Sequence, residues 1–102
     1  MLCLIIVAAA GELRLPAFFS DHVVLQRDAE VPLWGWSSPG ARVSVRASWL
    51  GAGALSARAD AGGRWQVTLS TSHAPGAQTI EIETGGERCV LADVRLGEVW
   101  LA

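Results

Sequence analysis

The sequence has no cluster of basic residues. All eight of its basic residues are arginine, they are spaced singly from Arg14 to Arg95, and the formal net charge is -2. A protein that binds nucleic acid needs a basic face to neutralise the phosphate groups. The spacing cannot assemble such a face, so nucleic acid is excluded as a partner.

A hydrophobic run long enough to cross a membrane is also absent. The apolar run at residues 1–10 ends in three alanines and gives way to Gly11 and Glu12, whereas a membrane-spanning helix needs about 20 apolar residues. An apolar run that ends in small residues is typical of a secretory signal, although no positive residues precede it. The run therefore predicts a signal-peptide remnant and a secreted or periplasmic protein, with a buried N-terminal strand as the alternative.

Cysteine is scarce. Cys3 lies in the predicted signal, which leaves Cys89 without an intramolecular partner once the signal is removed. Neither a histidine nor a second cysteine stands near Cys89 in the sequence to activate its thiol. We therefore expect Cys89 to be a small buried apolar residue in a strand.

The chain does contain a regular series of short β-type segments. Its 102 residues are 51% hydrophobic and 18% charged, which suits one globular domain, here residues 11–102. Gly, Pro, Asp and Ser interrupt the segments about every 8 to 12 residues, which is the spacing typical of sandwiches and barrels. We predict an all-β fold, an antiparallel β-sandwich (jelly-roll or immunoglobulin-like) of about seven to eight strands with no major helix. The predicted strands are 23–26, 31–36, 42–47, 65–69, 79–84, 89–92 and 98–101, with a loop and a further strand within 48–59.

Two short motifs invite a catalytic interpretation and fail it. Ser20, Asp21 and His22 are consecutive, but neighbouring strand residues point to opposite faces and cannot form a triad. We expect Ser20 and Asp21 to bind backbone donors at a turn and His22 to be partly buried. Residues 35–37 begin like a nucleophile elbow, yet Pro39 stands where a glycine is required. The two histidines are isolated, so no catalytic residue, cofactor or metal site is predicted.

Three tryptophans, Trp34, Trp36 and Trp100, are the candidate functional residues. Trp34 and Trp36 share one face of a predicted strand, and apolar residues occupy its other face, so both faces need a cover. Tryptophan is frequent at interfaces, and we therefore favour a domain interface, with stacking on a glycan as the alternative. The chain ends in the apolar segment Gly97–Leu101, which we expect to reflect truncation within a larger protein.

Four segments together resemble the N-terminal region of the sialate O-acetylesterase-like family, a group of SGNH-type carbohydrate esterases. They are Leu15–Arg27, in which Val23 stands where the family typically has Met, Val31–Trp36 together with Pro39–Gly40, Asp60–Trp65 and Gly97–Leu101. The resemblance keeps these segments in the family's order.

The resemblance implies a role for this region. In the family, the last segment runs on into Cys-Ser-Gly-Gln-Ser-Asn-Met, which carries the nucleophilic serine of the hydrolase domain, but Ala102 ends the chain here. No catalytic residue can therefore be carried over onto this sequence. The implied function is a non-catalytic β-sandwich whose partner is its own missing hydrolase domain, in an enzyme that removes O-acetyl groups from sialic acids or other acetylated glycans. The alternative is a stand-alone exported glycan-binding module.

Overall fold

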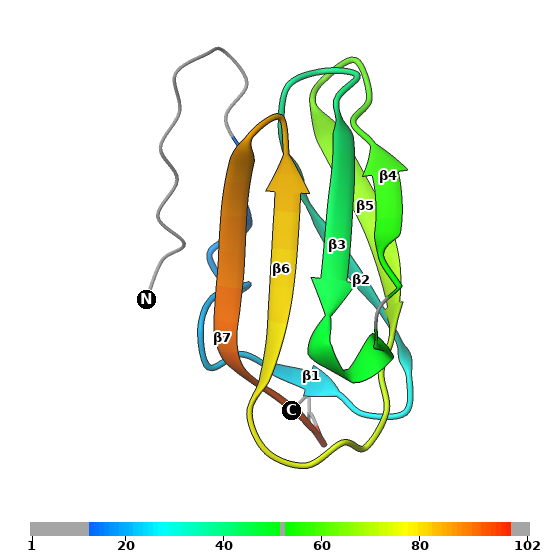
Figure 1. Ribbon diagram of the computed structural model, residues 1–102, viewed down its shortest axis with the longest axis vertical. Helices are drawn as coiled ribbons and strands as arrows, with labels where there is room; N and C mark the ends of the chain where they lie inside the picture. Colours follow the sequence, from blue (N-terminus) through cyan, green and yellow to red (C-terminus); the bar gives the residue numbers. More distant parts are fainter. Residues whose placement is uncertain (1–12, 52, 99–102) are drawn as a thin grey trace.

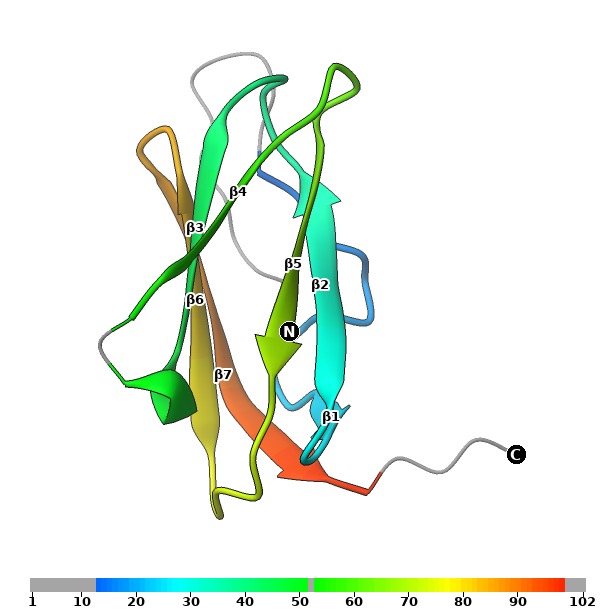
Figure 2. The same ribbon diagram turned by 90° about the vertical axis from the view of Figure 1, so that its right-hand side faces the viewer.

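The computed structural model describes residues 13–51 and 53–98, and it is an all-β structure, as predicted. Two β-sheets pack face to face, as Figure 2 shows from the side. One sheet has five strands in the order β1-β7-β6-β3-β4, and the other consists of β2 and β5 (Figure 1). The strands are β1 Val24–Gln26, β2 Glu30–Trp36, β3 Arg42–Ala47, β4 Leu55–Arg58, β5 Arg64–Ser70, β6 Gln78–Thr84 and β7 Glu87–Gly97.

The strands form where apolar and polar residues alternate. In β5, Trp65, Val67 and Leu69 are buried while the residues between them are exposed. Successive strand residues point to opposite faces, so one side of each sheet faces the core and the other faces water. The core cluster of buried residues combines these inward residues with Leu13, Phe19 and Ala59 from the connecting segments. Its strand members are Leu25, Leu33, Val43, Val45, Ala47, Trp65, Val67, Leu69, Ile80, Ile82, Cys89, Leu91 and Val94.

One strand pair departs from the predicted antiparallel sandwich. β1 pairs with β7 in parallel, with Val24 opposite Arg95 and Gln26 opposite Gly97. The other pairs are antiparallel. A parallel pair needs a long crossover connection, and here the whole sandwich lies between the two strands. Alternation of apolar residues reports which face is buried and carries no information on strand direction, so the sequence could not reveal this pair.

β7 is longer than predicted because it contains a bulge. Between the pairs Gln78–Val94 and Ile80–Leu91 the register of β6 and β7 shifts, and Asp93 in this segment has a left-handed backbone with φ of 52°. A bulge inserts an extra residue and interrupts the alternation that sequence analysis reads. A strand was predicted at 98–101, but β7 ends at Gly97 and Glu98 belongs to no strand. Residues 99–101 and the predicted signal at 1–10 lie outside the described residues.

The stretch 48–59 forms a short 3-10 helix, η1 (Ser48–Leu50), and then β4, which agrees with the predicted loop and strand. Cys89 is buried in the core, as expected. Its sulfur is disulfide-bonded in the full chain, whereas the expectation of a thiol without a partner concerned the chain after removal of the signal.

Pro32 in β2 shows which edge of the small sheet is open. Arg14 exchanges two backbone hydrogen bonds with Trp36, of 2.8 and 2.9 Å, on the edge of β2 that faces away from β5. Pro32 is four residues before Trp36, so it faces the same edge. Proline has no N–H to donate, and it is tolerated in a strand where that position needs no ladder bond.

Candidate functional site

Trp34 and Trp36 lie on the outer face of β2, and both are half-buried. Leu33 and Gly35 point the other way and are buried against the core. The spacing had predicted this division of the strand into two apolar faces. The core covers the inner face of β2. Residues 18 and 19 cover part of its outer face, a contact that sequence analysis had not predicted.

That cover is an aromatic cluster formed by Phe18, Phe19 and Trp34. The ring centroids of Phe18 and Phe19 lie 4.5 Å apart. The Trp34 ring lies edge to face with both, and its centroid is 5.3 Å from that of Phe18 and 5.0 Å from that of Phe19. This arrangement suits the quadrupoles of aromatic rings. Phe19 is 6% exposed and anchors the cluster in the core, whereas Phe18 is 57% exposed and faces solvent.

An open apolar groove of about 390 Å³ runs beside this cluster, between β1 and β2. Val24 on β1, 47% exposed, forms part of its wall together with Phe18. The groove residues are Phe18, Phe19, Val23, Val24, Leu25, Gln26, Val31, Pro32 and Trp34. The sequence feature that lies at this groove is the Phe18–Phe19 pair, of which Phe19 is buried and Phe18 is exposed.

Arg14, Trp36 and Arg64 form a row across the small sheet. Trp36 pairs with Arg14 on one side and with Arg64 on the other, and residues directly opposite each other share a face. The guanidinium carbon of Arg14 lies 5.9 Å from the centre of the Trp36 ring, and that of Arg64 lies 5.9 Å from the centre of the Trp34 ring. These distances are at the outer limit of cation–π attraction.

Gly35 lets the three elements of this row approach each other. A Cβ at this position would collide with the carbonyl oxygen of Arg14 and would lie 2.9 Å from the indole of Trp65. Glycine in a strand is often found where another backbone approaches closely. The glycine therefore allows both the Arg14 backbone and the Trp65 side chain to approach β2 closely.

The structure does not assemble a triad from Ser20, Asp21 and His22. Asp21 accepts a hydrogen bond of 2.8 Å from the backbone N–H of Ala92, and the Ser20 carbonyl accepts one of 3.2 Å from Val23. Asp21 therefore binds a backbone donor, as expected, but the donor lies in β7 rather than in the turn, and Ser20 takes part through its backbone carbonyl. The expectation that His22 is partly buried was wrong, because its side chain is 69% exposed.

His22 instead pairs with Asp93, which the bulge in β7 aims toward it. The distance from His22 Nδ1 to Asp93 Oδ2 is 2.7 Å, and Arg95 donates to the other carboxylate oxygen at 2.7 Å. The hydrogen bond with His22, followed by that from Arg95, lowers the pKa of Asp93 below its ordinary value of 3.8. Both groups lie at the surface, which makes the pair a surface contact that holds the turn before β1 against β7.

Residues 35–37 do not form a nucleophile elbow. Gly35 and Trp36 belong to β2, and Ser37, which follows, is buried and binds backbone groups of neighbouring residues. The next element is β3, whereas an elbow leads from a strand into a helix.

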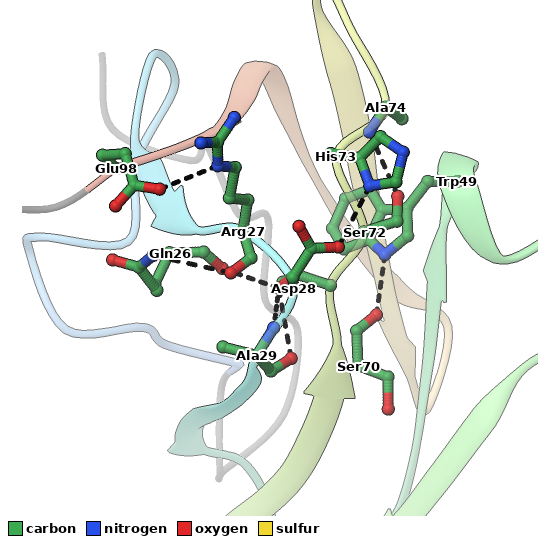
Figure 3. A network of polar contacts seen from close by, with 11 residues as sticks. Gln26, Arg27, Asp28, Ala29, Trp49, Ser70, Ser72, His73, Ala74 and Glu98 are labelled. Carbon is green, nitrogen blue, oxygen red and sulfur yellow. Dashed lines mark hydrogen bonds and ion pairs between the residues drawn. The ribbon is translucent and has the colours of Figure 1, made fainter.

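A polar network surrounds the loop between β1 and β2 (Figure 3). The Thr71 hydroxyl oxygen lies 2.6 Å from the Gln26 carbonyl oxygen and accepts a bond of 2.9 Å from the N–H of Ala29. At the same loop, Arg27 pairs with Glu98 at 2.8 Å and Asp28 with His73 at 3.1 Å. The network fixes the loop and the point where the chain leaves β7.

Trp100 lies outside the described residues. Within residues 13–51 and 53–98 there is no group of three or more His, Cys, Asp or Glu side chains that could hold a metal ion. The same part of the chain contains no helix long and apolar enough to span a bilayer.

Comparison with known proteins relates the chain to a solved structure. No protein-family model and no curated protein matches the chain. A crystal structure of a carbohydrate acetylesterase from Xanthomonas citri matches 86% of this chain with a TM-score of 0.78 and 36% sequence identity, and the chain spans 20% of the length of that enzyme. The chain is therefore related to one part of a carbohydrate esterase.

Proposed function

We propose that this chain is the non-catalytic N-terminal β-sandwich of an exported sialate O-acetylesterase-like enzyme. The complete enzyme would hydrolyse O-acetyl esters on sialic acids or other acetylated glycans through a seryl acetyl intermediate. Its serine would lie in a hydrolase domain that follows this region. Secretion, or export to the periplasm, rests on the apolar run at residues 1–10.

The strongest support is the likeness to the carbohydrate acetylesterase. An identity of 36% accompanies a shared fold over most of this chain, yet the match accounts for 20% of the other enzyme. A region of that size corresponds to one domain of the larger protein. The four segments that resemble the sialate O-acetylesterase-like family favour the same assignment.

We assign the contact with the hydrolase domain to the apolar groove. Phe18 and Val24 expose apolar surface at its rim, and such surface is typical of protein interfaces. A Cβ on Gly97, the last residue of β7, would lie 3.7 Å from Val24, so the chain leaves the sandwich beside the groove. A domain that follows β7 would begin next to this surface.

The test is a chimera in which this chain replaces the matching region of the Xanthomonas citri enzyme. We expect the chimera to fold and to release acetate from an acetylated glycan. Phe18→Ser should lower its melting temperature, because about 1 to 2 kcal/mol of interface burial is lost when a half-exposed Phe is removed. Val90→Ser, at an exposed valine on the outer face of the other sheet, is the matched control and should have little effect.

The same two substitutions in the isolated chain separate an interface from a local packing role. Phe18→Ser should change the stability of the isolated chain less than that of the chimera. Equal effects of Phe18→Ser and Val90→Ser in the chimera would contradict the interface, and a folded but inactive chimera would contradict the assignment to this enzyme class. The isolated chain should not hydrolyse p-nitrophenyl acetate above background, and turnover that a serine-directed inhibitor abolishes would count against a non-catalytic role.

A further inference from the structure

The edge of β2 that faces away from β5 runs along the apolar groove and is open there. Trp36 directs its N–H and C=O to this edge, where both bond Arg14. Strand residues two apart direct their backbone groups to the same edge, so Pro32 and Trp34 do so as well, and both line the groove. Within residues 13–51 and 53–98, the Trp34 N–H and C=O have no hydrogen-bond partner on this edge. The groove therefore contains unpaired backbone groups as well as apolar side chains.

The two sheets also differ in width, and the difference falls on this side of the sandwich. Neighbouring strands lie about 4.8 Å apart, so five strands span about 19 Å and two strands about 5 Å. β5 contacts β4 at one margin of the larger sheet, and β1 is the other margin, beside β2 in Figure 2. Leu13 and Phe19 fill part of the core, but the groove between β1 and β2 stays open. One more strand beside β2 would cover it.

A cover for this groove has two requirements. It needs apolar side chains, because Phe18 and Val24 expose apolar surface at the rim. It also needs backbone partners, because burying the Trp34 N–H and C=O without hydrogen bonds is costly. An extended strand meets both requirements, since alternate side chains enter the groove while its backbone bonds the edge. A helix packed on the groove would leave the Trp34 backbone groups unpaired.

Pro32 favours a strand from the same chain over a free peptide or a second copy. It offers a C=O but no N–H, so a strand residue opposite it keeps its own C=O unpaired. Proline on an exposed edge is one of the features that prevent pairing between separate molecules. A strand held near the edge by a covalent link tolerates this loss, because its effective concentration is high. Gly97 at the end of β7 lies beside Val24, so a domain that follows β7 is linked at the groove.

We propose that an extended strand of the hydrolase domain pairs with the open edge of β2 at Pro32 and Trp34 and places alternate apolar side chains in the groove. The source of the strand rests on the proposed function. The open edge and the groove are properties of this chain. The added strand would make the small sheet three-stranded and would fix the orientation of the two domains.

The experiment compares amide hydrogen exchange, read by NMR, in the full 102-residue chain and in the chimera with the Xanthomonas citri enzyme. The Trp34 amide should exchange at least about tenfold more slowly in the chimera, because a hydrogen-bonded amide exchanges only when its bond opens. The amides of Leu33 and Gly35, which point toward β5, are internal controls and should be protected in both proteins.

Two variants separate a hydrogen bond from simple burial. Trp34→Leu removes the indole and keeps the N–H, whereas Trp34→Pro removes both. The difference in melting temperature between these variants in the isolated chain is the baseline. In the chimera the difference should be larger by about 2 to 4 °C, since only there does the N–H have a partner to lose.

Three outcomes would overturn the added strand. They are a Trp34 amide that exchanges equally fast in both proteins, a variant difference that is the same in both, and a Trp34 amide as protected as that of Leu33 in the isolated chain. In the last case, protection that rises with protein concentration would identify a second copy as the occupant. A chimera that releases acetate with an unprotected Trp34 amide would refute the strand alone, and a folded, inactive chimera with a protected amide would refute the proposed function alone.

Discussion

Replacing Gly63 by alanine tests the turn that connects β4 to β5. Gly63 has a φ of +85°, and a Cβ on it would lie 2.5 Å from the carbonyl oxygen of Ser37. The same two residues are joined by a hydrogen bond of 2.8 Å from the Ser37 N–H to the Gly63 carbonyl. The substitution therefore strains the backbone and also pushes apart two segments that the turn holds together.

The two effects can be estimated separately. A left-handed backbone costs an L-residue about 1 to 2 kcal/mol. Displacement of Ser37 weakens or breaks its hydrogen bond, worth about 0.5 to 1.5 kcal/mol. We expect Gly63→Ala to lower the free energy of unfolding by roughly 2 to 3 kcal/mol in total.

The neighbouring glycine is the matched control. A Cβ on Gly62 would meet the Asp60 carboxylate at 3.5 Å, an ordinary contact, and its φ is outside the left-handed region. Gly62→Ala should be neutral or should stabilise by up to about 1 kcal/mol, because alanine restricts the unfolded chain. Urea unfolding followed by tryptophan fluorescence measures both variants. If the two differed by less than about 0.5 kcal/mol, a limit set by ordinary surface substitutions, the strain would be absent.

Three further predictions concern polar groups. Thr71→Val removes the hydroxyl that bonds the backbone of residues 26–29 and should lower the free energy of unfolding by about 1 to 3 kcal/mol in the same assay; an unchanged value would contradict its role. The pKa of Asp93 is lowered in the folded state by His22 first, so the stability that it contributes is present above about pH 4 and is lost as the pH falls through the folded value. Asp93→Asn, which tolerates the left-handed backbone, should flatten the acid side of a melting-temperature profile, and a parallel profile would refute this. Trp65→Phe should cost much less than Trp65→Ala, for which about 3 to 5 kcal/mol is expected, because the buried indole N–H has no hydrogen-bond partner among the described residues; similar melting temperatures of the two variants would contradict this.

The strands that alternate cleanly were predictable from the sequence. β3 was predicted with its observed limits, and β5 and β6 to within one residue at their ends. β7 was predicted too short because the bulge near Asp93 places Val94, rather than Asp93, in the core. The pairing of β1 with β7 depends on contacts across the whole chain, which local periodicity does not contain.

The candidate site was likewise predictable from the sequence only in part. The shared face of Trp34 and Trp36 follows from their spacing of two residues in a strand. Their neighbours do not, since Phe18 and Arg14 come from a segment with little regular structure and reach β2 only in the folded state. The resemblance to an esterase family came from the order of four segments, and the likeness to a carbohydrate acetylesterase supports it at the level of carbohydrate esterases.

The parallel pairing of β1 with β7 has a mechanical consequence. A pulling force applied through Val23, before β1, and Glu98, after β7, acts on the two strands in opposite directions along their length. The interstrand hydrogen bonds then share the load and must be stretched together. In an antiparallel pair the same two points would lie at one end, and the bonds would open one at a time. A sandwich attached on both sides within a longer chain would therefore resist extension through its shortest strand, with the pair of Arg27 and Glu98 at the loaded end.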